Sequence, residues 1–108
     1  MSESASHRRA KRRAAGFSGR TEVPLPGGGR LDAATRRRAY EVERSGNMQR
    51  LVKAAERLAR SNRPQRILQV PDGDMSKATQ AMRQAGVCGT VTNLTGTRRR
   101  WVQGCRRR

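Results

Sequence analysis

The chain has 108 residues, enough for one small domain, and it carries 25 Lys and Arg against eight Asp and Glu, a formal net charge of +17. Hydrophobic residues make up only 33% and aromatic residues 3%, so we expect part of the chain to lie outside a packed core. There is no run of about 18 apolar residues that would cross a bilayer, and the basic N-terminal stretch lacks the apolar segment of a secretory signal, so we expect a cytoplasmic protein without a membrane partner.

Three regions follow from the composition along the chain. Residues 1–20 form a basic N-terminal segment, in which 8–15 can become helical only when docked on something. Residues 21–97 form the folded domain, and 98–108 form a basic tail that extends the last strand briefly. The domain begins with a short edge strand at 21–25, because Pro24 and Pro26 interrupt its alternation.

The next two runs, 30–33 and 39–43, alternate in polarity and predict an antiparallel hairpin. If Thr35 pairs with Arg38, then Asp32 lies opposite Glu41. One face of the hairpin then carries only charged side chains and the other only apolar ones. The charged face comprises Arg30, Asp32, Glu41 and Glu43, and the apolar face comprises Leu31, Ala33, Tyr40 and Val42.

The remainder of the domain reads as helix, strand, helix, strand. Apolar positions over 48–59 follow helical spacing, with Asn47 or Ser45 as N-cap. Residues 66–70 fit a central strand, a second helix ends at Gly86, and 88–94 alternate as a last strand. Strand–helix–strand units of this length cross over right-handedly and give parallel pairing. We therefore expect an α/β (α+β) fold with a mixed sheet flanked by helices.

The charge balance indicates that the partner is a nucleic acid, because a basic protein that binds its phosphates releases their condensed counterions, which favours the complex. Arginine runs contact phosphates whatever the bases are. The residues expected to bind the backbone are Arg8, Arg9, Lys11, Arg12, Arg13, Arg30, Arg36, Arg37, Arg38, Arg98, Arg99 and Arg100. Trp101 lies among arginines, and we expect it to close the end of the core rather than to stack on a base.

Two carboxylates directly opposed across a hairpin repel by up to about 1 kcal/mol unless a cation lies between them. One interpretation is a solvated face on which Arg30 and Arg36 to Arg38 neutralise the acids. The other is a magnesium site, because this ion prefers oxygen ligands and two or three carboxylates on adjoining strands suffice to bind it. Asp32 and Glu41 would then be the metal ligands, and Glu43 would contact a second metal or position the water. The spacing leaves both open.

A family resemblance extends the second interpretation. The run LPGGGRLDA, followed by AYEVE, a polar break and a helix containing Gln49, resembles the PD-(D/E)XK restriction-endonuclease-like superfamily over roughly residues 8 to 71. The resemblance implies an αβββαβ core, here with an additional C-terminal helix and strand. It also implies a nuclease that uses Mg²⁺ or Mn²⁺ to cut DNA, or second to that RNA, as a homodimer or as part of a larger assembly.

The resemblance also implies roles for individual residues. Asp32 and Glu41 match the two acidic metal ligands, and Glu22 matches an additional acid that some members use. Glu43 departs from the pattern, because it stands where the family normally has a lysine. Some members place the missing cation on the next helix, a role open to Lys53 or Arg50, and Gln49 would lie near the metal on that helix.

A second function belongs to a different class. The same charge and low apolar content fit a non-enzymatic nucleic-acid-binding protein, such as a ribosome-associated, packaging or virion component that keeps the fold without the chemistry.

The two cysteines lack CxxC spacing, so we expect neither a zinc site nor a disulfide framework, with Cys88 a reduced and buried filler.

Overall fold

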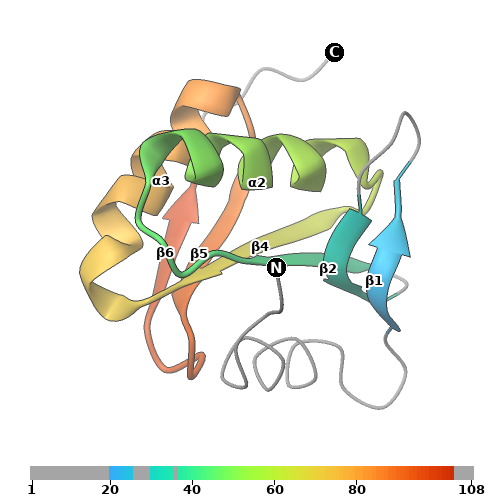
Figure 1. The fold of residues 1–108 in the computed structure, drawn as a ribbon, viewed down its shortest axis with the longest axis horizontal. Coiled ribbons are helices and arrows are strands. Elements are labelled where there is room, and N and C mark those ends of the chain that lie inside the picture. The colour runs from blue at the N-terminus through green and yellow to red at the C-terminus, as the bar shows by residue number, and fades with distance from the viewer. Residues whose placement is uncertain (1–19, 26–29, 36, 104–108) are drawn as a thin grey trace.

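The computed structural model describes residues 20–25, 30–35 and 37–103 (Figure 1). The elements in chain order are β1 (Arg20–Pro24), β2 (Arg30–Ala34), β3 (Arg38–Val42), α2 (Met48–Arg60), β4 (Gln65–Val70), the 3-10 turn η1 (Asp72–Asp74), α3 (Met75–Ala85), β5 (Gly89–Asn93) and β6 (Arg99–Val102). The helix expected within 8–15 and the side chains of Arg8, Arg9, Lys11, Arg12, Arg13 and Arg36 lie outside the described residues.

The six strands form one mixed sheet whose spatial order follows the chain. Strands β1, β2 and β3 are antiparallel neighbours. Each helix then crosses over to a parallel strand, so β3, β4 and β5 run in the same direction. The expected α/β fold with a mixed sheet and parallel crossovers is confirmed. The chain reverses once more around Gly96, whose φ of 76° is left-handed, and β6 pairs antiparallel with β5.

Both helices lie on one face of the sheet (Figure 1). Asn47 caps helix α2, and its Oδ1 accepts from the Arg50 N–H at 3.2 Å, as an N-cap should. Its apolar stripe and that of α3 pack against the strands and against each other. The buried side chains of this layer include Leu51, Leu58, Met82, Leu68, Val70 and Val91. The apolar periodicity read from the sequence therefore identifies the core-facing stripe of each helix.

Two expectations about single residues are wrong. Trp101 is 66% exposed on β6, so it does not close the end of the core. Cys88 is half-buried and disulfide-bonded rather than a reduced filler; Cys105 lies outside the described residues.

Neither α2 nor α3, the two helices of the described part, has the length and apolar character of a membrane span.

Candidate functional site

The hairpin of β2 and β3 has the register that the sequence predicts. Ala33 pairs with Tyr40 and Ala34 with Ala39, and the Thr35 N–H donates to the Arg38 carbonyl at 2.8 Å in the connecting turn. Continuing this register one step places Asp32 opposite Glu41. The predicted meeting of these two acids across the hairpin is confirmed.

Past the Ala33–Tyr40 pair, carboxylates replace backbone groups as hydrogen-bond acceptors. Glu41 Oε2 accepts from the Asp32 N–H at 3.1 Å, and Asp32 Oδ2 accepts from the Val42 N–H at 2.8 Å. Each acid therefore satisfies a strand N–H that would be costly to bury without a partner. These hydrogen bonds fix the positions of both carboxylates at the end of the hairpin ladder, where side chains replace backbone carbonyls as acceptors.

The pair is not on a solvated face. Glu41 is 1% exposed, and its side chain reaches α2, where Arg57 Nε donates to Glu41 Oε1 in an ion pair. The Arg57 side chain is 30% exposed, so the guanidinium lies at the edge of this buried cluster. The interpretation of a solvated acidic face neutralised by Arg30 and Arg36 to Arg38 is therefore wrong for Glu41.

Burial and the proximity of two acids govern the electrostatics of the cluster. The pKa of Glu41 is raised to about 8, first by burial and then by the neighbouring Asp32, while Arg57 works in the opposite direction. Burial alone would lower the pKa of Arg57, yet the attraction of Glu41, then Asp32 and Glu43, raises it above its ordinary value. Burial and the adjacent carboxylate together outweigh the guanidinium, so Glu41 readily takes up a proton.

The other candidates lie around this cluster and share none of the hydrogen bonds described above. Glu43 is half-buried, and its Oε1 accepts from the Ser45 N–H at 3.1 Å. Gln49, Arg50 and Lys53 are exposed on α2. Among the described residues, the cation that contacts Glu41 is Arg57, which the sequence reasoning did not select. Positions 50, 53 and 57 share one helical stripe, so the 3.6-residue period was the signal available for it.

A metal at this place would have oxygen ligands only. Among the described residues, no three His, Cys, Asp or Glu side chains are grouped closely enough to hold an ion. Asp32 and Glu41 nevertheless lie together and are oriented by backbone hydrogen bonds, and Asp32 and Glu43 are both half-buried rather than sealed. Two carboxylates with remaining water ligands are a donor set that fits Mg²⁺ or Mn²⁺. Glu22 lies in β1, on the far side of β2 from Glu41.

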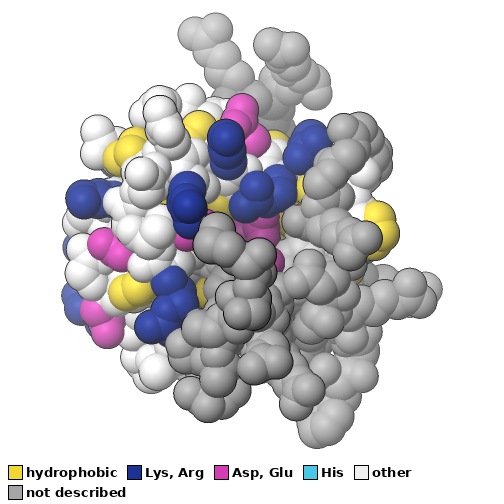
Figure 2. Space-filling model, viewed as in Figure 1, with side chains coloured by type: hydrophobic (Ala, Val, Ile, Leu, Met, Phe, Trp, Pro, Cys, Tyr) yellow, Lys and Arg dark blue, Asp and Glu magenta, His cyan; other side chains and the backbone are white. Residues whose placement is uncertain are grey.

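On the face drawn in Figure 2, the described basic residues are spread out rather than gathered in one patch. Figure 2 shows Lys and Arg side chains over the described part of one face, with Asp and Glu between them. Arg37, Arg38, Arg99 and Arg100 are exposed, as phosphate binding requires. Arg98 is exposed as well, with its Nη1 3.6 Å from Asp72 Oδ1. Arg30 lies in β2.

No known protein family, characterised protein or solved structure matches this chain. The functional interpretation therefore depends on the geometry of the acids, of Arg57 and of the sheet.

Proposed function

We propose that this protein is a metal-dependent nuclease with a restriction-endonuclease-like fold, which hydrolyses phosphodiester bonds in DNA or, second to that, in RNA. The observation that carries the proposal is the opposed pair Asp32 and Glu41 with Arg57 reaching it from the following helix. The element order supports it, since three antiparallel strands, a helix and a parallel strand correspond to the βββαβ part of that core.

Asp32 and Glu41 would hold Mg²⁺ or Mn²⁺, with Glu43 beside them. When bound, such an ion stabilises charge on the phosphoryl oxygens and lowers the pKa of a bound water. The chain prepares this site by fixing each carboxylate through a strand N–H, at 2.8 Å for Asp32 and 3.1 Å for Glu41. Acids held on strands by such hydrogen bonds keep their geometry better than acids on a loop.

Arg57 takes the place of the lysine that the resemblance leads one to expect. Its planar guanidinium presents several donors in a fixed fork and matches phosphate geometry. Because the side chain is 30% exposed, part of it faces the solvent from which a substrate would arrive. Arg57 would hold Glu41 in the free protein and a phosphate oxygen of the substrate in the complex.

The raised pKa of Glu41 supports a functional role for the cluster, because buried, coupled acids with shifted pKa values concentrate at active sites. With its pKa near 8, Glu41 carries a proton at neutral pH in the absence of a further cation. Ligands must be ionised to bind a metal, so the proposed activity should increase with pH up to about that value.

The experiment is a cleavage assay on supercoiled plasmid and on structured RNA with Mg²⁺, Mn²⁺ or EDTA. We expect metal-dependent nicking that is lost in Asp32→Asn and Glu41→Gln while nucleic-acid binding is retained. Glu56→Gln is the matched control, because Glu56 is an exposed acid on α2 outside the cluster. Nicking by Asp32→Asn at the rate of the unaltered chain would contradict the proposal.

A second function is favoured by the burial of Glu41. Both of its oxygens are engaged, one by Arg57 and one by the Asp32 N–H, and it is 1% exposed. If Arg57 permanently fills the place of the cation, the cluster is a structural ion pair and the protein binds nucleic acid without cutting it. This function would be selected if the protein binds nucleic acid equally well in EDTA and yields no cleavage product with either Mg²⁺ or Mn²⁺.

A further inference from the structure

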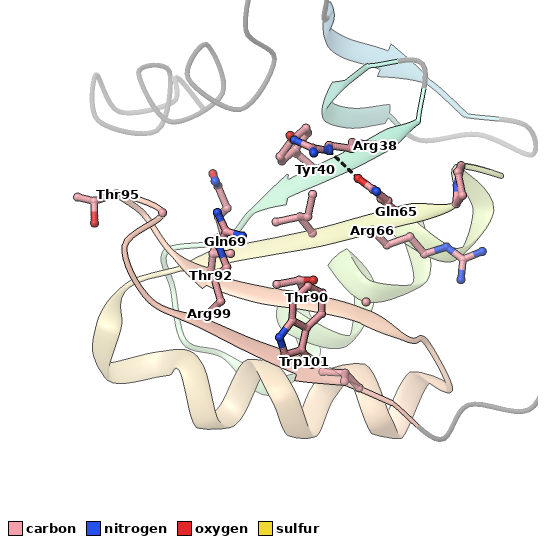
Figure 3. A pocket seen from close by; sticks show the side chains of 15 residues that line it. Arg38, Tyr40, Gln65, Arg66, Gln69, Thr90, Thr92, Thr95, Arg99 and Trp101 are labelled. Atoms are coloured by element: carbon pink, nitrogen blue, oxygen red, sulfur yellow. Dashed lines mark hydrogen bonds between the residues drawn. The ribbon is translucent and has the colours of Figure 1, made fainter.

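The sheet face opposite the helices holds a cavity of about 540 Å³ (Figure 3). This volume is in the range of small-molecule sites. Strands β3 to β6 contribute its walls, and its described lining contains three arginines and no acid. Tyr40 and Trp101, the only tyrosine and the only tryptophan of the chain, both line it.

The strand register arranges these side chains in two adjacent rows. Tyr40, Ile67, Thr90 and Trp101 are successive partners across four strands and form the first row. Gln69, Thr92 and Arg99 are successive partners two residues further along and form the second. Rows on one face of a sheet lie about 7 Å apart, and neighbours within a row about 5 Å. A largely apolar row that ends in an exposed indole therefore runs beside a polar row that ends in a guanidinium.

The polar row contains unmet hydrogen-bonding capacity. Gln69 is 7% and Thr92 6% exposed. Within the described part of the chain, Gln69 Oε1 and Thr92 Oγ1 have no hydrogen-bond partner. Nearly all buried polar side-chain atoms in folded proteins are paired. Two adjacent unpaired atoms lining one cavity indicate that a ligand supplies their partners.

We propose that this cavity binds an unpaired nucleobase of single-stranded nucleic acid. The base would stack on Trp101, its polar edge would bond to Gln69 and Thr92, and an adjoining phosphate would contact Arg99. An aromatic surface beside arginines is the combination that single-stranded nucleic acids use, since each base offers a π face and each phosphate a charge. A paired base would have its hydrogen-bonding edge occupied and its faces stacked.

This site is independent of the proposed hydrolysis. Tyr40 lines the cavity, whereas Glu41, the next residue, reaches α2 on the opposite face. The two sites share only the class of ligand. A binding measurement in EDTA therefore tests the base site whether or not the acid cluster cuts anything.

Trp101 makes the test direct, because the fluorescence of the one tryptophan reports on stacking. The full chain is titrated in EDTA at about 0.3 M salt, which weakens purely ionic binding, with three probes: single-stranded octathymidylate, an abasic oligomer of the same length, and a G·C-paired hairpin whose stem stays double-stranded under these conditions. We expect the single strand to quench Trp101 and to bind roughly tenfold tighter than the abasic oligomer. Equal affinity for the abasic oligomer, or unchanged fluorescence, would overturn the proposal.

Two substitutions separate binding from folding. Thr92→Val and Gln69→Met remove the unpaired polar atoms with little change in volume, so we expect the melting temperature to hold or to rise while affinity for octathymidylate falls roughly fivefold. Arg60→Gln on α2 is the charge control for Arg99→Gln. Trp101→Leu, followed with a labelled oligonucleotide, should also weaken binding. Affinities equal to that of the unaltered chain in Thr92→Val and Gln69→Met would refute the hydrogen-bonding role.

Discussion

Arg57 on α2 and Glu41 on β3 form an ion pair that joins the helix layer to the β2–β3 hairpin. The contact lies where carboxylates, not backbone carbonyls, accept from the strand N–H groups of the hairpin. The same residues therefore determine how α2 lies on the sheet and how the acids are oriented. Stability and the proposed chemistry are coupled at this cluster.

Replacing Arg57 should destabilise the fold more than replacing another surface arginine. Arg57→Met removes the partner of a buried carboxylate, and the loss should be about 2 kcal/mol, because Arg57 is only partly buried. Urea unfolding at about pH 9, where Glu41 is ionised in the fold, measures it, with Arg60→Gln as a control expected to change little. In the double variant Arg57→Met, Glu41→Gln the buried charge is gone, so part of the loss should be recovered. Additive losses would show that the two side chains are not coupled.

The stability of the protein should fall as the pH rises from weakly acidic to weakly basic. Glu41 has a pKa near 8 in the fold against 4.5 in the unfolded chain. Between these values the folded state binds a proton that the unfolded state has released, so each pH unit costs up to about 1.4 kcal/mol. The stability that this bound proton contributes is fully present below the pKa of 4.5 in the unfolded chain, and it is lost as the pH rises through the folded pKa of about 8.

Urea midpoints at about pH 5, 6.5 and 8 test this dependence. Glu41→Gln should have a flatter profile than the unaltered chain, because the amide does not titrate. Glu56→Gln, which removes an exposed acid, should retain the slope. A profile that rises with pH in the unaltered chain would mean that Arg57 keeps Glu41 ionised in the fold.

The register of the hairpin could be predicted from the sequence because alternation in both runs leaves one pairing that sorts charged from apolar side chains. The pairing of Ala33 with Tyr40 follows from that pattern alone. The burial of Glu41 could not be predicted in this way, since it depends on where α2 crosses the sheet. Periodicity gives the inward stripe of a helix but not which strand residue each position meets.

The candidate base site was missed for a related reason. Gln69 and Thr92 are unremarkable in sequence, and only the strand order places them side by side. Trp101 lies in the segment that the sequence analysis takes as a basic tail, and it was expected to close the end of the core rather than to stack on a base. The reversal at Gly96 instead pairs β6 with β5 and leaves the indole exposed. Long-range pairing, not local propensity, created this surface.

Gly89 should be required for the close approach of β4 and β5. A Cβ at this position would lie 2.4 Å from the Arg66 carbonyl oxygen and 3.1 Å from Met82 Cε. Gly89→Ala therefore has to push the strands apart, and we expect a loss of about 2 kcal/mol in unfolding free energy. Gly73→Ala is the matched control, because nothing lies within 4 Å of the added methyl group. Equal stability of the two variants would show that the strands adjust without cost.

Manganese should raise the melting temperature of the protein if Asp32 and Glu41 bind it. A ligand that binds only the folded state stabilises it by an amount that grows with the ratio of concentration to Kd, about 2.7 kcal/mol at a hundredfold excess over Kd. Because Glu41 has to lose its proton first, the shift should be larger near pH 8 than near pH 6. Asp32→Asn should abolish the shift and Glu56→Gln should preserve it. A shift of the same size in Asp32→Asn would show that the ion binds elsewhere. The proposed hydrolysis would then lose its metal site. The proposed base site on the opposite face of the sheet would be unaffected.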